Sequence, residues 1–232
     1  EATAMNTTAV GSYANASGAY STALGFKTAA SNEDAVALGN YSTSAGKSAF
    51  AAGTLANAAE KDSLAIGHSA TTTKENGIAI GTNAKATTDN SIALGAKSVT
   101  DTAVSTSSGV IGGRTYSFAG GNAVGTLSIG DSGAERTITN VAAGRVSATS
   151  TDAVNGSQLH ATKDVVDNHE NRITTIEGDI NTLNNRIING GANGLNEAKA
   201  YTDQQVSSVA AASAALAGLH PLDFDKHLSL IH

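Results

Sequence analysis

One spacing governs the first hundred residues: a glycine recurs every fourteen residues. An alanine stands two positions before each of these glycines, and the position directly before each is apolar. Three positions before the glycine the chain carries threonine in the first two units and an apolar residue in the other five. A strict period of this kind indicates stacked structural units. The periodic glycines are Gly11, Gly25, Gly39, Gly53, Gly67, Gly81 and Gly95.

Each unit predicts two short strands joined by tight turns. Alternation around the alanine has the period of a strand, and the glycine ends that strand because it takes positive φ without steric cost. Small residues beyond the turn, such as Ala14 and Ala16, predict a second strand across a thin interior. Residues 1–100 are therefore predicted to form a mainly β solenoid of parallel coils. Glycines off the period, such as Gly18, are expected to tolerate substitution better.

An interior of alanine buries little apolar surface in each coil. At about 25 cal/mol per Å² this burial hardly offsets the roughly 1–2 kcal/mol of backbone entropy lost per residue. Parallel sheets normally have both faces covered. A close-packed oligomer is therefore favoured over the alternative, a monomeric solenoid.

One stretch of the repeat carries a family resemblance. The octapeptide Ser91-Ile92-Ala93-Leu94-Gly95-Ala96-Lys97-Ser98 resembles the head of trimeric autotransporter adhesins of the YadA-like kind. The resemblance implies a left-handed parallel β-roll, three of which pack into a trimeric head.

Composition supports a thin, extended molecule. Aromatic residues make up 4% of the chain, and it has no Trp, which is too little bulky apolar material for one large core. The absence of cysteine excludes a disulfide framework. A net charge of −6 without basic clusters argues against a nucleic-acid partner. Without a signal peptide or an apolar run of eighteen residues, the chain is expected to be a processed or cloned fragment.

The turns that follow the periodic glycines predict a candidate receptor surface. Aromatic residues are enriched at interfaces, and a short row of large side chains occupies these turns in the first coils. The alternative is that they cover the turns or are buried between subunits. The row consists of Tyr13, Phe26, Tyr41 and Leu55.

The period breaks after Gly95, and residues 101–130 are predicted to hold a head insertion and the last coil. The insertion is expected to be a loop or hairpin that carries Tyr116 and Phe118, before a strand resumes at Leu127. Long loops are often functional, so these two residues are a second candidate receptor site. The alternative is a structural adaptor that ends the roll.

Residues 131–158 resemble the family's neck, which narrows a wide head onto a coiled coil. Thr151 or Asp152 is a plausible helix N-cap. The residues that match the neck are Asn140, Val141, Gly144, Asp152, Ala153, Val154, Asn155, Gln158 and Leu159.

A heptad seam over 159–189 predicts a coiled-coil stalk. Isoleucine at both a and d positions shifts preference toward trimers or tetramers. His169 on the seam is read as a polar layer or a frayed heptad rather than a metal or anion site. The seam consists of Leu159, Thr162, Val166, His169, Ile173, Ile176, Ile180, Leu183 and Ile187.

Residues 190–232 are predicted to hold a glycine-rich linker at 190–194 and a second helix from about 195 to 219. By resemblance, 220–225 is the start of a membrane anchor whose barrel strands are missing. Contact with a membrane is therefore expected only through an anchor that this sequence lacks.

No catalytic constellation is predicted. The six histidines lack metal-ligand spacing, and the glycines serve turns rather than a phosphate loop, so neither metal nor cofactor is expected. Two function classes remain. The first is a bacterial surface adhesin at the outer membrane, a homotrimer whose head binds a host receptor or matrix protein. The second is a structural spacer, or a self-association module for autoagglutination or biofilm. The resemblance implies ligands such as collagen, laminin, fibronectin or a receptor of the carcinoembryonic-antigen-related class.

Overall fold

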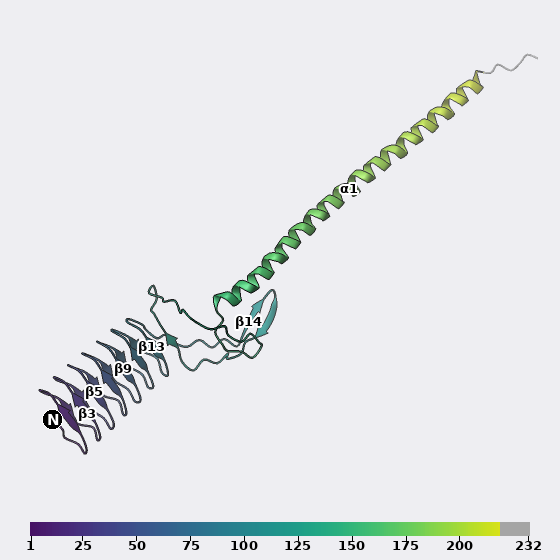
Figure 1. The fold of residues 1–232 in the computed structure, drawn as a ribbon. Helices are drawn as coiled ribbons and strands as arrows, with labels where there is room; N and C mark the ends of the chain where they lie inside the picture. The colour runs from purple at the N-terminus through teal and green to yellow at the C-terminus, as the bar shows by residue number, and fades with distance from the viewer. Residues whose placement is uncertain (219–232) are drawn as a thin grey trace, which may run out of the picture. The chain divides into compact units, whose positions relative to one another are not determined.

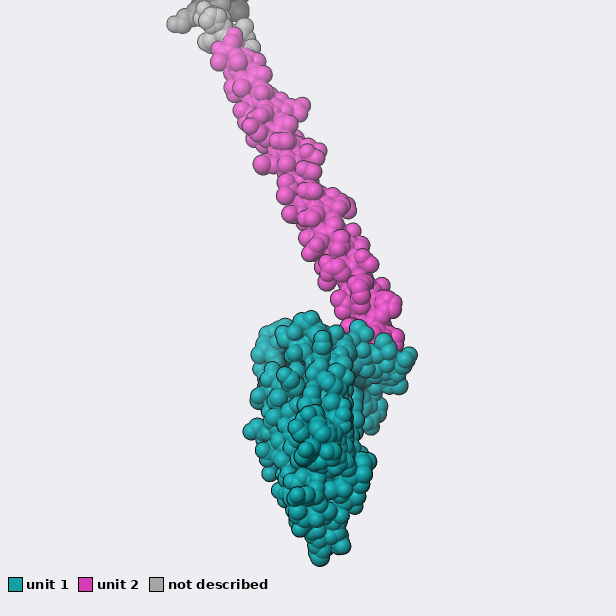
Figure 2. Space-filling view, turned by 90° about the vertical axis from the view of Figure 1, so that its left-hand side faces the viewer, with its two compact units in different colours: residues 1–155 teal, residues 156–232 magenta. Residues whose placement is uncertain are grey.

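The computed structural model describes residues 1–218 and separates the chain into two units, each described here by itself. The first is Glu1–Asn155, and the second begins at Gly156. Figure 2 shows the first unit in teal and the second in magenta.

The first unit opens with the predicted stack of coils (Figure 1). A three-residue strand ends directly before each periodic glycine, and in the first six coils a two-residue strand follows it. The longer strands are β1 (Thr8–Val10), β3 (Thr22–Leu24), β5 (Val36–Leu38), β7 (Phe50–Ala52), β9 (Leu64–Ile66), β11 (Ile78–Ile80) and β13 (Ile92–Leu94). The shorter strands are β2 (Asn15–Ala16), β4 (Ala29–Ala30), β6 (Thr43–Ser44), β8 (Asn57–Ala58), β10 (Thr71–Thr72) and β12 (Lys85–Ala86).

The strands form two parallel sheets whose register is the sequence period. Each residue pairs with the residue fourteen positions later, as Ala9 pairs with Ala23. The longer strands build an eight-stranded sheet in chain order, and β16 (Leu127–Ser128) adds to its end beside β13. The shorter strands build a six-stranded sheet. The resumption of the stack at Leu127 is thus as predicted.

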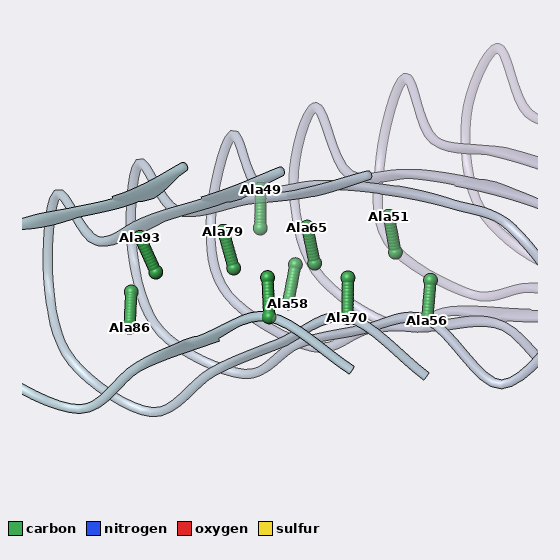
Figure 3. Close-up of a cluster of buried hydrophobic side chains, with 10 residues drawn as sticks. Ala49, Ala51, Ala56, Ala58, Ala65, Ala70, Ala79, Ala86 and Ala93 are labelled. Carbon is green, nitrogen blue, oxygen red and sulfur yellow. The ribbon is translucent and has the colours of Figure 1, made fainter. Parts of the chain in front are cut away.

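The interior between the two sheets is filled by alanine. Ala51, Ala65 and Ala79 from the longer strands are fully buried, as are Ala56 and Ala58 from the opposite side. Figure 3 shows their methyl groups pointing toward one another from the two sheets. The polar or charged residues buried among them are serines and threonines, so no side chain larger than threonine fits between the sheets.

The turns differ from the prediction in one respect. The periodic glycines have φ between +113° and +141°, as expected. Gly18 was expected to tolerate substitution better than the periodic glycines, but a Cβ there would lie 1.9 Å from the carbonyl oxygen of Asn32, closer than the 2.7 Å contact at Gly67. Adjacent coils approach so closely that a glycine off the period is also required.

The insertion is a β-hairpin, one of the two forms expected. Strands β14 (Ser108–Ile111) and β15 (Arg114–Ser117) pair antiparallel. Gly112 and Gly113 join them with φ of +57° and +77°, the two positive angles that a type I′ turn requires.

The second unit is one helix, α1 (Gly156–Ala217), of 62 residues. It begins at Gly156, so the prediction of an N-cap at Thr151 or Asp152 is wrong. It also continues through 190–194, so the predicted linker and separate second helix are wrong. Each glycine costs a helix about 1 kcal/mol relative to alanine, but a helix already formed gains one hydrogen bond per added residue. The predicted anchor start, 220–225, lies outside the described residues.

We expect Gly67→Ala to lower the melting temperature of the head far more than Gly113→Ala. Both glycines have positive φ, at +129° and +77°, but a Cβ on Gly67 would lie 2.7 Å from the backbone of Gly81, whereas nothing lies within 4 Å of one on Gly113. Backbone strain alone costs about 1–3 kcal/mol, and the collision adds to it only at Gly67. Circular dichroism melts compare the two; equal melting temperatures would show that close stacking is not limiting.

Candidate functional site

A cluster of aromatic side chains lies along one edge of the roll, on the turns that follow the longer strands. The Tyr13 and Phe26 rings meet edge to face with centroids 6.0 Å apart, and Phe26 meets Tyr41 in the same way at 5.4 Å. Such pairs stabilise beyond the area that they bury. We call Tyr13, Phe26, Lys27, Tyr41 and Leu55 the aromatic ridge.

The Lys27 ammonium group lies close to all three aromatic rings. Its Nζ lies 5.9 Å from the ring centroid of Tyr13, 5.4 Å from that of Phe26 and 5.6 Å from that of Tyr41. These distances fall within the range in which a cation is attracted to an aromatic face. The structure therefore brings three of the four predicted row residues together around a lysine that sequence reasoning missed.

The ridge is exposed and its backbone is strained. Tyr13 is 75% exposed, Tyr41 47% and Leu55 49%. Tyr13, Lys27, Tyr41 and Leu55 have φ between +52° and +61°, in the left-handed region. The corresponding turn of a later coil carries Asn83, a residue that adopts this conformation more readily. The same turn position is left-handed in the other coils as well, with φ of +55° at Ser69 and +62° at Lys97, so this conformation belongs to the repeat, and the aromatic side chains are what distinguish the ridge.

The hairpin holds the second candidate site. Tyr116 and Phe118 line one hollow of about 410 Å³ together with Ser147 and Ser150. A Cβ on Gly109 would lie 2.9 Å from the Phe118 ring, so a larger residue on that strand would displace the ring. No ridge residue lines this hollow. The two predicted receptor sites are therefore separate.

Most predicted neck residues meet in one closed loop. The Asn155 Nδ2 donates to the Val141 carbonyl at 3.1 Å. A Cβ on Gly144 would lie 2.1 Å from the carbonyl oxygen of Ala153, so these segments are in backbone contact. Asn140 enters the loop with φ of +60°.

Arg145, which the sequence did not single out, closes the neck loop. Its Nε donates to Asp152 Oδ2 at 2.8 Å, its Nη2 to Oδ1 at 3.1 Å, and its backbone N–H to Oδ2 at 3.0 Å. The guanidinium and then the backbone N–H of Arg145 lower the pKa of Asp152. Val154 is exposed, while Gln158 and Leu159 belong to α1.

The Arg136 side chain donates hydrogen bonds to the last coil of the stack. Its Nη1 donates to Ser98 Oγ at 3.1 Å and to the Ile129 carbonyl, and its Nη2 donates to the Ala96 carbonyl. This side chain satisfies carbonyls where no further coil follows. Sequence reasoning missed it because nothing in the repeat points to position 136.

Among residues 1–218, nothing covers the predicted seam of α1. Every seam residue, from Leu159 to Ile187, is exposed, and α1 has no buried residue. His169 is exposed with the rest. Within residues 1–218 there is no group of three or more acidic or histidine side chains placed to hold a metal ion. In the same range no helix has both the length and the apolarity needed to cross a bilayer.

A thin parallel β-roll followed by a long helix with a heptad seam is the combination of a head and a coiled-coil stalk. The YadA head-domain repeat matches 2–28, 30–56, 58–84 and 73–98, and the coiled stalk of trimeric autotransporter adhesins matches 137–182. Together the two matches span more than half of the chain. The chain belongs to the trimeric autotransporter adhesins.

Individual relatives are similar to only part of the chain. The autotransporter adhesin BtaE of Brucella suis is 58% identical over 71 residues, which are 31% of this chain and 10% of BtaE. The chain thus spans about a tenth of that relative's length. Autotransporter adhesins of this kind are exposed on the outer membrane, and they are binding or structural proteins.

Two solved structures resemble the chain. The C-terminal YadA-like domain of BPSL2063 from Burkholderia pseudomallei is 46% identical and covers 45% of this chain and 49% of its own, with a TM-score of 0.44. The collagen-binding domain of the Yersinia adhesin YadA is 27% identical and covers 69% of this chain and 98% of its own, with a TM-score of 0.41.

We expect Arg145→Ala to raise the pKa of the Asp152 carboxyl toward its ordinary value of 3.8. Folding lowers the pKa of Asp152, so the ion pair stabilises the neck loop at pH values above the ordinary pKa. This stabilisation is lost as the pH falls through the pKa of the folded state. Carboxyl carbon chemical shifts followed against pH measure the change. Arg114→Ala, on the hairpin, is the control, and an unchanged Asp152 titration in Arg145→Ala would contradict the assignment.

Proposed function

We propose that this chain is a bacterial surface adhesin that assembles as a homotrimer and binds an extended matrix protein through the aromatic ridge. Collagen is the first candidate ligand. The protein acts by binding rather than catalysis, from a position outside the outer membrane. Laminin, fibronectin and receptors of the carcinoembryonic-antigen-related class are the comparison ligands.

The spacing of the ridge carries this proposal. Parallel coils are about 4.8 Å apart, so Tyr13 and Tyr41, two coils apart, repeat at about 9.6 Å. A polyproline II chain rises 3.1 Å per residue with three residues per turn, so its equivalent side chains repeat at about 9.3 Å. Such a chain laid along the ridge presents equivalent positions to both tyrosines, with Phe26 between them. Aromatic surfaces are a common means of recognising polyproline II segments.

The homotrimer is supported by the faces that a single chain leaves uncovered. Along the longer strands, Val10, Leu24 and Leu94 point outward and are about half exposed. The outward positions of the shorter strands carry polar or small residues such as Asn15 and Lys85. Only one face of the roll is therefore apolar, and it supplies the contact between subunits.

The stalk supports the same assembly. Ile173, Ile176 and Ile180 are exposed on α1, and no residue of this helix is buried by the part of the chain that the structure describes. Isoleucine at both a and d positions favours three or four strands over two. A trimer also presents three ridges, so a weak single site is strengthened by avidity.

The variant Tyr13→Asn/Tyr41→Asn tests the ridge. Asparagine adopts left-handed φ more readily than tyrosine, which offsets the loss of the ring contacts with Phe26, so we expect the melting temperature to change little. Loss of two aromatic contacts should weaken collagen binding about tenfold or more. Surface plasmon resonance on immobilised collagen measures the affinity of the variant and of the parent.

Ser69→Asn is the matched control for this test, because Ser69 occupies the same turn position on a later coil at φ of +55°. Tyr116→Ala/Phe118→Ala tests the hairpin site in parallel. If the tyrosine variant binds collagen as the parent does, the ridge is not the binding site.

The variant Ile173→Asp/Ile176→Asp/Ile180→Asp tests the trimer. Carboxylates would meet on the seam without partners, and an unpaired buried charge costs about 3–5 kcal/mol. We expect the stalk to dissociate. Light scattering measures the mass, and a parent protein that is monomeric or dimeric at micromolar concentration would refute the trimer.

A further inference from the structure

The exposed apolar residues of α1 do not keep one heptad register along the whole helix. Up to Ile187 they follow the seam of the proposed stalk trimer. Continued at the same spacing, that seam would carry two glycines, a glutamate and a glutamine among its next six positions. Three copies of Glu197 would then meet without partners, and an unpaired buried charge costs about 3–5 kcal/mol. The six positions are Gly190, Gly194, Glu197, Tyr201, Gln204 and Ser208.

The large apolar residues beyond the glycines define a second seam. Leu195, Val209 and Leu216 share one heptad position, and they are 72%, 63% and 74% exposed. Val206, at the e position of the same register, widens this apolar surface. Alternating spacings of three and four place the second seam at Leu195, Ala198, Thr202, Gln205, Val209, Ala212 and Leu216.

The second seam is displaced from the first by one residue. Leu195 follows Ile187 by 195 − 187 = 8 residues, where the first seam requires seven. One residue of an α-helix turns the chain by about 100°. A regular helix that directs Ile187 toward its partners would therefore direct Leu195 and Val209 away from them.

The same two partner helices are the occupants of the second seam. In the single chain α1 is one continuous helix from Gly156 to Ala217. Two neighbours that pack along 159–187 therefore run beside 195–216 as well, at a high effective concentration. Because no residue of α1 is buried within the described chain, its second apolar face is available to them.

The segment between the two seams is the part of α1 that unwinds at the least cost. Gly190-Gly191-Ala192-Asn193-Gly194 contains three glycines, each of which costs a helix about 1 kcal/mol relative to alanine. A Cβ on any of these glycines would meet nothing within 4 Å, so crowding in the described chain does not require them. Two turns that take eight residues need about 4.0 residues per turn instead of 3.6.

We propose that residues 190–194 are a phase-shift joint in the stalk, where the three helices unwind locally and their contact passes from the first seam to the second. This inference rests on the proposed homotrimer. Spreading the extra residue over 173–195 would place 195 − 173 = 22 residues in six turns, about 3.67 per turn, a spacing that gives a right-handed supercoil. The isoleucine heptads of the first seam instead require left-handed packing, so the shift is confined to the glycines.

Single cysteines distinguish the two registers, because the chain has no cysteine of its own. Under mild oxidation of the full chain, Val209→Cys should form disulfides between subunits at least about tenfold faster than Ser208→Cys. Only side chains that face each other bring their Cβ atoms close enough for the bond. Ile187→Cys, on the first seam, is the positive control. Denaturing gels without reductant measure the linked dimers.

Two outcomes of the cysteine experiment have different meanings. If Ile187→Cys forms disulfides and Ser208→Cys does so as fast as Val209→Cys, the first register continues and the joint is wrong. If Ile187→Cys forms none, the stalk trimer is wrong and the joint fails with it. Failure of this inference and failure of the proposed homotrimer are therefore told apart.

Hydrogen exchange tests where the shift occurs. In the parent, amides of 190–194 should exchange at least about tenfold faster than those of 176–187, because locally unwound backbone is less protected. Deletion of Asn193 brings both seams into one register. It should slow exchange at the joint by about the same factor and raise the melting temperature of the helical circular dichroism signal.

The variant Gly191→Ala/Gly194→Ala is the control for the deletion, because it raises helix propensity and leaves the register displaced. Fast exchange at the joint should persist in this variant. Uniform exchange along the parent helix, protection restored by the two alanines, or a lower melting temperature after deletion of Asn193 would each overturn the joint.

Discussion

The close approach of the two parallel sheets is the constraint on which the rest of the head depends. The space between the sheets admits a methyl or hydroxyl group, and the core is accordingly alanine with serine and threonine. Coils are stacked as tightly, since a Cβ on Gly53 would lie 2.5 Å from the Gly67 carbonyl oxygen. No coil can slip or bulge without a collision, so each position repeats the environment of the position fourteen residues away.

A core this thin moves the apolar side chains to the outside. Aliphatic residues such as Leu24 and Ile66 occupy the outward face of the longer strands, and Ile173 and Ile180 occupy an exposed line on α1. Burial is the main favourable term in folding, and here most of it is available only between chains. Under the proposed trimer, folding and assembly are therefore inseparable, as in obligate oligomers.

The strict period made the coils, strand positions and glycine turns predictable, because the same chemistry recurs seven times. The left-handed turn residues were not predictable: tyrosine, lysine and leucine carry no signature of positive φ. The aromatic row could be foreseen from spacing, but its central Lys27 could not. Arg136 bonds Ser98 across 38 residues outside any repeat. The glycines at 190–194 led to the wrong prediction of a linker, because intrinsic helix propensity is a weak guide inside a long helix.

The length of the head is set by the number of coils in the stack. From β1 to β13 each coil pairs with the coils before and after it in the same fourteen-residue register, so a whole coil can be gained or lost without disturbing the others. Gain or loss of one coil changes the length of the head by about 4.8 Å. A coil inserted after residue 56 would lengthen the head and leave the aromatic ridge, whose last residue is Leu55, as it is.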